Sequence, residues 1–298
     1  MSEFLGKTAV ISGGAEGIGL SIARAVGKQG MKVVLGDIDE AQLQLAEQSL
    51  RDEGIEVLAL PLDVTKPEQW QQIAKAAQER FGKIHMLVNN AGVSGAPGPI
   101  EHTNIKDWNW VMDVNLMGVI YGTQTMIPLI KQHSEGGWLI NVASMAGMIG
   151  VPMGQAYTAS KVAVVGMSES WRAELTPQNI QVSVLCPAFV QTRINHSSRN
   201  KPSEYQTAAD NEKEMSPGRA AMAEHMQKVI DRGLAVEVVG ERVIEAIRDN
   251  ELYIFTHPNY RAVLQKRFQA VDQAFERAAA SPLVSHLLDE EIDGFMKG

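Results

Sequence analysis

The sequence predicts an α/β fold in which helices cover both faces of a doubly wound, seven-stranded parallel sheet. Short runs of apolar and β-branched residues recur along the chain, and each is bounded by residues typical of turns. Apolar residues are continuous within the runs rather than alternating, which indicates strands that are covered on both faces. The runs occupy residues 8–13, 32–37, 57–63, 86–92, 138–144, 182–187 and 252–258.

Segments with helical spacing of apolar residues separate these runs. Residues 18–29 follow the first strand and end near Gly30, and residues 39–53 follow the second and end near Gly54. Because strands and helices alternate in this way, the connections are expected to be crossovers between parallel strands.

The alternation stops at about Thr192. The segment 193–235 is polar and irregular, and loops of that length are uncommon in compact domains unless they act as lids or linkers. We expect a substrate lid there. Residues 258–298 begin with helical spacing and predict an appended helical extension, with 1–298 forming a single domain.

Composition excludes several classes of partner. The chain has 298 residues with 27 basic and 35 acidic side chains, a net charge of −8, and no basic run that could follow a nucleic acid backbone. No segment reaches the roughly 18 apolar residues of a membrane span. The single cysteine, Cys186, cannot form an internal disulfide, and the N-terminal residues lack signal-peptide features, so we expect a cytoplasmic protein.

A glycine-rich turn follows the first strand and opens the first helix, with the sequence SGGAEGIG at 12–19. Glycines there allow positive φ and close approach of a pyrophosphate, while the helix N-terminus offers unpaired N–H groups. The spacing is G-x-x-x-G-x-G, and such glycines can also form a simple turn. The predicted cofactor-binding residues of this turn are Gly13, Glu16, Gly17, Ile18 and Gly19.

An acidic residue ends the second strand. Asp37 lies 18 residues after Gly19, where a carboxylate can accept hydrogen bonds from the adenosine ribose and repel a 2′-phosphate. With Glu16 in the turn and Ile38 after the strand, we expect no nearby Arg or Lys to neutralise such a phosphate, so NAD is favoured over NADP. Alternatively, Asp37 is a solvated turn or capping residue, although Asp39 is the better cap candidate.

Tyr157 and Lys161 are four residues apart at the start of a predicted helix, so both side chains project from one face. An adjacent ammonium group and an oxidised nicotinamide would lower the pKa of the Tyr157 phenol and prepare it for acid/base catalysis. Alone, such a pair is more commonly an ordinary feature of a helix surface.

Further polar residues are expected at the same edge of the sheet. Ser144 follows the fifth strand, residues 89–92 (NNAG) end the fourth, and Asn115 lies in the helix after it. Doubly wound folds bind ligands at the carboxyl ends of their strands, so these groups are predicted to converge on one site.

Together these residues resemble the short-chain dehydrogenase/reductase family, which has a short Rossmann-type fold. The match extends from residue 6 to about 192. The residues that carry it are Ser12, Gly13, Gly17, Ile18, Gly19, Asp37, Asp63, Val64, the NNAG of 89–92, Asn115, Ser144, Tyr157, Lys161, Pro187, Val190 and Thr192.

The resemblance implies a catalytic set. In it, Tyr157 transfers the proton, Ser144 positions the substrate oxygen, Lys161 binds the nicotinamide ribose and lowers the tyrosine pKa, and Asn115 holds a relay water.

The resemblance also implies further contacts with the dinucleotide. Asp63 and Val64 would lie against adenine, and Thr192 would touch the carboxamide. The remaining implied contacts are Asn90, Ala91 and Gly92 on the ribose side, with Pro187 and Val190 in the nicotinamide motif.

The chain departs from the family pattern at two positions: Ser12 stands where Thr is usual, and Ala188 stands where Gly is usual. Its lid and extension resemble, more loosely, bacterial Cα-dehydrogenases of aromatic alcohols. Family members form dimers and tetramers through the helices carrying Asn115 and Tyr157, which implies a homodimer or homotetramer.

The residues between Ser144 and Tyr157 include flexible thioethers that could line an apolar substrate pocket. Met145 and Met153, with Phe189, are the candidate substrate-binding residues, and core packing explains them equally well. The seven histidines show no mutual spacing typical of metal ligands, so we predict no metal.

These observations predict an NAD-dependent oxidoreductase that interconverts a secondary alcohol and a ketone on an apolar substrate, with an aromatic one included. Two alternatives remain open: a steroid or acyl-thioester ketone reductase, and a non-catalytic NAD-binding redox sensor.

Overall fold

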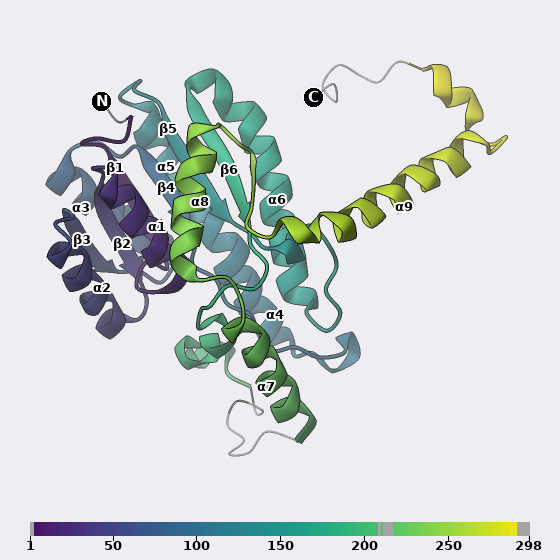
Figure 1. Ribbon diagram of the computed structural model, residues 1–298, viewed down its shortest axis with the longest axis horizontal. Helices are drawn as coiled ribbons and strands as arrows, with labels where there is room; N and C mark the ends of the chain where they lie inside the picture. Colours follow the sequence, from purple (N-terminus) through teal and green to yellow (C-terminus); the bar gives the residue numbers. More distant parts are fainter. Residues whose placement is uncertain (1–2, 208–209, 211–216, 291–298) are drawn as a thin grey trace. The chain divides into compact units, whose positions relative to one another are not determined.

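The computed structural model describes residues 3–207, 210 and 217–290, and it contains the predicted seven-stranded parallel sheet (Figure 1). Every strand overlaps the run that predicted it. The strands are β1 (Thr8–Ser12), β2 (Lys32–Asp37), β3 (Val57–Pro61), β4 (Met86–Asn89), β5 (Gly137–Val142), β6 (Ile180–Cys186) and β7 (Tyr253–Phe255).

Helices connect the strands, as the alternation predicted. They are α1 (Gly17–Lys28), α2 (Glu40–Asp52), α3 (Pro67–Phe81), α4 (Ile105–Met112), α5 (Gly118–Lys131), α6 (Gln155–Leu175), α7 (Pro217–Asp231), α8 (Val236–Arg248) and α9 (Arg261–Ala279). Short 3₁₀ and π-helical turns, labelled η, lie between several of them.

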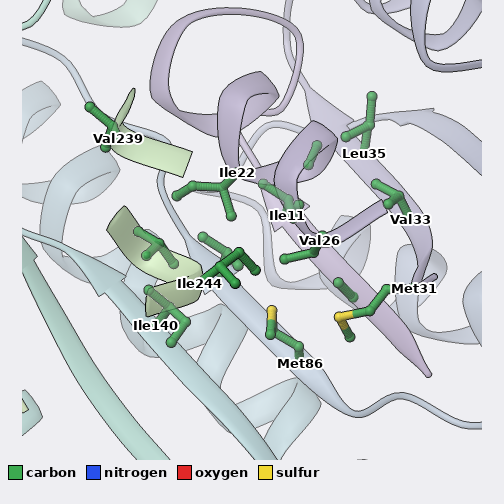
Figure 2. Close-up of a cluster of buried hydrophobic side chains, with 14 of the residues drawn as sticks. Ile11, Ile22, Val26, Met31, Val33, Leu35, Met86, Ile140, Val239 and Ile244 are labelled. Atoms are coloured by element: carbon green, nitrogen blue, oxygen red, sulfur yellow. The ribbon is translucent and has the colours of Figure 1, made fainter. Parts of the chain in front are cut away.

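Neighbouring residues of a strand point to opposite faces of the sheet. Because the strands are continuously apolar, both faces of the sheet are apolar. In β1, Ile11 packs in a cluster with Ile22 of α1 and Val239 of α8, which Figure 2 shows. Val10 packs on the other face, in a cluster that includes Trp70 of α3. The continuous apolar runs therefore correspond to strands enclosed between two helical layers.

The strand order is β3-β2-β1-β4-β5-β6-β7. The chain moves outward from β1 to β3 and then returns to place β4 on the other side of β1. Ligands of doubly wound folds bind where the order reverses, at the carboxyl ends of the strands. This switch point lies between β1 and β4, where the glycine-rich turn and the NNAG segment begin.

The segment 193–235 is more regular than its composition suggested. It contains the 3₁₀ segments η5 (Ile194–Asn200) and η6 (Ser203–Tyr205), followed by helix α7, and residues 208–209 and 211–216 lie outside the described part. The expectation of an irregular stretch is wrong for α7, because Ala, Glu, Gln and Lys in that sequence are strong helix formers.

The chain divides into two compact units, Met1–Thr256 and His257–Gly298. The second contains α9, none of whose residues is buried. Among the described residues, no helix has the length and apolar character needed to cross a bilayer.

Candidate active site at the carboxyl edge of the sheet

The glycine-rich turn adopts a backbone that side chains would obstruct. Gly13 has a φ of +61° and Gly17 a φ of +55°. A Cβ on Gly19 would lie 2.1 Å from the carbonyl oxygen of Gly13, and one on Gly17 would lie 3.3 Å from Cγ2 of Thr192. Glu16, the N-cap of α1, makes no side-chain capping bond, so the first amides of α1 have no side-chain acceptor. This cradle suits a dinucleotide pyrophosphate.

Hydrogen bonds join the turn to the NNAG segment. The hydroxyl of Ser12 accepts from the backbone N–H of Asn90 at 3.0 Å and of Ala91 at 3.2 Å. In return, Nδ2 of Asn90 donates to the carbonyls of Ser12 at 3.0 Å and Gly13 at 2.8 Å. Ser12 thus supplies the hydroxyl group that Thr usually supplies at this position of the family pattern. The side-chain amide of Asn90 holds the turn in place.

Asp37 lies beside this turn at the end of β2. Its carboxylate accepts from the N–H of Ala15 and of Asp39, each at 3.0 Å. Burial raises the pKa of Asp37, and the nearby Glu16 and Asp39 charges raise it further, whereas the two N–H donors lower it. Asp39 caps α2 by accepting from the N–H of Gln42 at 3.1 Å, as predicted.

Two arginines reach this region from the segment after β6. Arg193 and Arg199 both form ion pairs with Glu16, and Arg193 also donates to Oε1 of Gln42 at 3.4 Å. These two arginines lie beside the glycine-rich turn, whereas the charges that act on Asp37 are those of Glu16 and Asp39. The arginines follow Glu16 by 177 and 183 residues, so no local pattern could reveal them.

The residues expected near adenine have well-defined local roles. The Asp63 carboxylate accepts from the N–H of Thr65 at 3.0 Å and from its hydroxyl at 2.7 Å, in a turn that leads into α3. Val64 is buried, and its carbonyl accepts from the indole N–H of Trp70 at 3.1 Å.

Tyr157 and Lys161 project from the same face of α6, as predicted. The ammonium of Lys161 lies 5.7 Å from the centroid of the Tyr157 ring and donates to the carbonyl of Val142 at 2.8 Å. Burial lowers the pKa of Lys161 to about 8, although the nearby Cys186 raises it.

Burial also raises the pKa of Tyr157, and a hydrogen bond with Ser144 opposes this effect. In the chain alone, the phenol is thus harder to ionise than a free tyrosine. Desolvation is the largest cause, and the ammonium group of Lys161 donates to the carbonyl of Val142 rather than to the phenol.

Ser144 lies at the end of β5, next to the backbone of the β6 end. Its hydroxyl accepts from the N–H of Ala146 at 3.1 Å and donates to the carbonyl of Pro187 at 3.4 Å. It is the N-cap of the 3₁₀ turn η3 (Met145–Gly147), which fixes the hydroxyl position. Ala188 does not adopt a positive φ, so its methyl group causes no backbone strain.

Asn115 lies on a π-helical turn, η2 (Asp113–Met117), between α4 and α5. Such turns occur frequently at functional sites. Its side-chain oxygen accepts from the N–H of Val93 at 2.8 Å, and its Nδ2 donates to the Val93 carbonyl at 2.9 Å and to Ser160 at 3.2 Å. Every polar atom of this side chain is therefore engaged.

Thr192 and Val190 follow β6 on the nicotinamide side of the turn. Thr192 approaches Gly17, and Val190 is buried and bridges to Leu234. Phe189 lies between them and Pro187, and its carbonyl accepts from the N–H of Leu234 at 2.9 Å. The contact between Thr192 and Gly17 brings the residues after β6 against the glycine-rich turn.

A small cavity lies beside Tyr157. It includes Tyr157 among its walls and extends to α4, where Trp108 and Val111 line it, and to Gln155 at the start of α6. The proposed pocket residues Met145, Met153 and Phe189 are not among its lining residues. Sequence reasoning missed these α4 residues, because only the packing of α4 against α6 brings them near Tyr157.

Two histidines lie together at the opposite edge of the sheet, which sequence spacing did not suggest. The rings of His85 and His133 are 4.6 Å apart, and with Glu135 they form a group whose donor atoms could surround a metal. However, Nδ1 of His85 accepts from the N–H of Thr8 at 3.2 Å, which leaves the proton on Nε2, facing Glu135 at 3.1 Å. This tautomer suits a hydrogen bond better than a metal bond.

Comparisons with known proteins agree with this geometry. The family model for short chain dehydrogenases matches residues 7–203. A CLA biosynthesis dehydrogenase/reductase from Lactiplantibacillus plantarum is 36% identical over 273 residues, which cover 91% of this chain and 95% of that protein. A Cα-dehydrogenase from Sphingobium sp. strain SYK-6 is 32% identical over 271 residues, covering 91% of this chain and 87% of the relative.

A solved structure shares the fold closely. The crystal structure of a short-chain dehydrogenase/reductase from Burkholderia phymatum in complex with NAD has a TM-score of 0.86 and 36% identity, covering 92% of this chain and 97% of that one. The chain belongs to the short-chain dehydrogenase/reductase family. It is a nicotinamide-dependent oxidoreductase of alcohols and ketones, and the predicted resemblance, including the looser one to Cα-dehydrogenases, is confirmed.

Proposed function

We propose that this enzyme uses NAD to interconvert a bulky, mainly apolar secondary alcohol and its ketone, with Tyr157 transferring the proton. The observation that carries this proposal is the position of Tyr157. Its side chain is a wall of the cavity beside α4, the hydroxyl of Ser144 hydrogen-bonds to it, and the ammonium of Lys161 lies 5.7 Å from its ring.

The side chains divide the work of proton transfer. In the oxidation direction, the phenolate of Tyr157 takes the hydroxyl proton, and Ser144 orients the alcohol oxygen. When bound, NAD accepts the hydride from the carbinol carbon and brings a positive charge that favours the phenolate. Lys161 supplies a second positive charge. Since the side chain of Asn115 is engaged with Val93 and Ser160, its backbone carbonyl is the group that holds a relay water.

The cofactor is NAD, and the carboxylate of Asp37 at the end of β2 would accept hydrogen bonds from its adenosine ribose. The turn of Gly13, Gly17 and Gly19 is too close to its neighbours to admit side chains, which suits a pyrophosphate at the N-terminus of α1. The relative from Burkholderia phymatum was crystallised with NAD, which supports this assignment.

The substrate carries an aromatic or similarly bulky group next to the reacting carbon. The cavity itself has a volume of only about 10 Å³, so it offers a contact surface and does not enclose the whole group. Trp108 and Val111 make this surface apolar, and Gln155 and Ser94 add polar groups. The 32% identity to a Cα-dehydrogenase supports this choice. We expect the highest kcat/KM for benzylic alcohols in a panel that also contains steroids, polyols and acyl thioesters. A clear preference for polyols or acyl thioesters would contradict the proposal.

The proton-transfer role is tested by Tyr157→Phe. Because positioned acid/base catalysis contributes roughly 10²–10⁴ in rate, kcat should fall by about that factor. NAD affinity, measured by titration, should change little, because the turn and Asp37 remain intact. Turnover close to that of the wild type would rule out this role.

The enzyme also assembles with copies of itself, as a homodimer or homotetramer, and acts in the cytoplasm. Helix α9 supports the assembly, because Phe268 is 57% exposed and Phe275 is 72% exposed on a helix without buried residues. Light scattering on the full chain tests it. A monomer at all concentrations would contradict the proposal, and cell fractionation tests the location.

A further inference from the structure

A buried ammonium group lies in the segment between β6 and α7. The Lys201 side chain is only 3% exposed, although lysine is almost never buried without partners. Its Nζ lies 2.5 Å from Oδ1 of Asp107, which belongs to α4, and 2.7 Å from Oδ2 of Asp210, which belongs to its own segment. Two carboxylates thus surround one ammonium group.

Other groups complete the surroundings of this ion cluster. The ring of Trp110 lies 5.5 Å from the ammonium of Lys201, at a distance typical of a cation–π contact. Asp210 also accepts from the N–H of Thr207 at 2.7 Å and from its hydroxyl at 2.8 Å. The cluster therefore joins Lys201, Thr207 and Asp210 to one another and to α4.

The neighbouring contacts of this segment are more exposed. The Tyr205 hydroxyl donates to Asp113 at 2.9 Å, and Lys66 pairs with Glu204 at 3.3 Å, where both side chains are substantially exposed. Exposed pairs contribute little, whereas loss of one partner from a buried pair leaves an uncompensated charge. Lys201 is thus the contact whose loss should release the segment.

The ion cluster lies directly behind the substrate cavity. Asp107, the α4 partner of Lys201, is itself a lining residue, together with Trp108, Val111 and Tyr157. Ser197, four residues before Lys201, accepts from the N–H of Ser94, another lining residue, at 3.1 Å. The segment and the cavity wall are therefore connected at two places.

We propose that Lys201 is a positioning residue for the substrate: by bridging Asp107 and Asp210, it fixes residues 201–207 on α4 and so sets the shape of the cavity beside Tyr157. This inference rests on the proposed alcohol-oxidising function of that cavity. Lys201 thus controls recognition of the bulky group. Tyr157 transfers the proton, and the glycine-rich turn and Asp37 bind the cofactor.

The test compares Lys201→Met with Glu204→Gln, which removes the exposed ion pair of the same segment. Hydrogen exchange is measured by mass spectrometry on the full chain. Exchange of amides in 201–207 should accelerate by about tenfold or more in Lys201→Met and stay within about twofold in Glu204→Gln.

Kinetics on a benzylic alcohol provide the second readout. In Lys201→Met, KM for the alcohol should rise by about tenfold, with kcat and KM for NAD nearly unchanged, and Lys201→Arg should restore part of the loss. Equal effects of the two variants on exchange, or an unchanged alcohol KM, would overturn the proposal.

A second variant and the independent exchange measurement cover two other outcomes. If Lys201→Met does not fold, Asp210→Asn weakens the cluster from the segment side and should give a smaller change in the same direction in both readouts. No change in either readout contradicts the role of the cluster. If the wild type turns over no alcohol, the proposed function fails, while the exchange experiment still decides whether Lys201 fixes the segment.

Discussion

The cofactor half of the site and the substrate segment are stabilised by different interactions. The turn at Gly13–Gly19 is held by backbone hydrogen bonds, by Asn90 and by close glycine contacts. Residues 193–207 are instead held by charged side chains, among them Arg193, Arg199 and Lys201. Substitution of Lys201, which contacts α4 and not the glycine-rich turn, can therefore alter substrate recognition while cofactor binding and proton transfer are preserved.

The pH dependence of turnover should be determined by Tyr157 of α6, and the ion cluster at Lys201 should not affect it. Alcohol oxidation needs the Tyr157 phenolate, and burial raises the pKa of Tyr157. Below that pKa the phenolate fraction increases by about tenfold per pH unit, so oxidation should accelerate as pH rises, and ketone reduction should slow once the phenol ionises.

Initial rates between about pH 6 and pH 10 provide the measurement. The oxidation rate of Lys201→Met should rise over the same pH range as that of the wild type, because the substitution leaves α6 unchanged. A limb displaced in that variant would mean that the segment also controls proton transfer.

Gly19→Ala should disrupt the cofactor half. A Cβ there would lie 2.1 Å from the Gly13 carbonyl oxygen, so the turn must shift. We expect a loss of about 1–3 kcal/mol in the free energy of unfolding, together with greatly weakened NAD binding.

The matched control is Gly166→Ala, at an exposed position of α6 where a Cβ meets no atom within 4 Å. It should stabilise the protein by about 0.5–1 kcal/mol, because glycine is unfavourable inside a helix. Urea unfolding of both variants measures these changes. A neutral Gly19→Ala would show that the turn tolerates side chains.

Asp37→Asn should weaken NAD binding by about tenfold, because hydrogen bonds to a charged acceptor contribute about 1.5–3 kcal/mol and the amide retains only part of this. NADPH should bind more tightly than to the wild type, since the repelling charge is gone. Asp39→Asn removes a charge two residues away and keeps the α2 cap, so it should stay within about twofold. Fluorescence titration measures the affinities of the wild type and both variants for NAD and for NADPH.

Glu16→Gln should have the smallest effect. The carboxylate pairs with Arg193 and Arg199 at the surface, and such pairs contribute about 1 kcal/mol or less each. NAD affinity should therefore change by less than about fivefold. NADPH affinity should increase, because the two guanidinium groups are then available for a phosphate. An unchanged NADPH affinity would place both arginines away from the ribose.

Local patterns in the sequence predicted most of the fold and the placement of Tyr157 and Lys161 on one helix face. The seven apolar runs correspond to the seven strands, and the four-residue spacing correctly placed Tyr157 and Lys161 on one helix face. These features depend on residues close in sequence, or on strand ends that meet at one edge of the sheet.

Contacts between distant residues could not be predicted in this way. Lys201 and Asp107 are 94 residues apart, and Arg193 and Glu16 are 177 apart. His85 and His133 belong to loops before and after different elements and meet only when β4 and β5 pair. The burial that raises the pKa of Tyr157 could not be predicted either, because it depends on the complete packing around α6.

The bonds from Asn90 to the glycine-rich turn have a kinetic consequence. They join the end of β4 to the turn after β1. On the side of the turn at Glu16, the ion pairs of Arg193 and Arg199 join it to the segment after β6. Because salt screens exposed charges, the dissociation rate of the dinucleotide should increase with ionic strength.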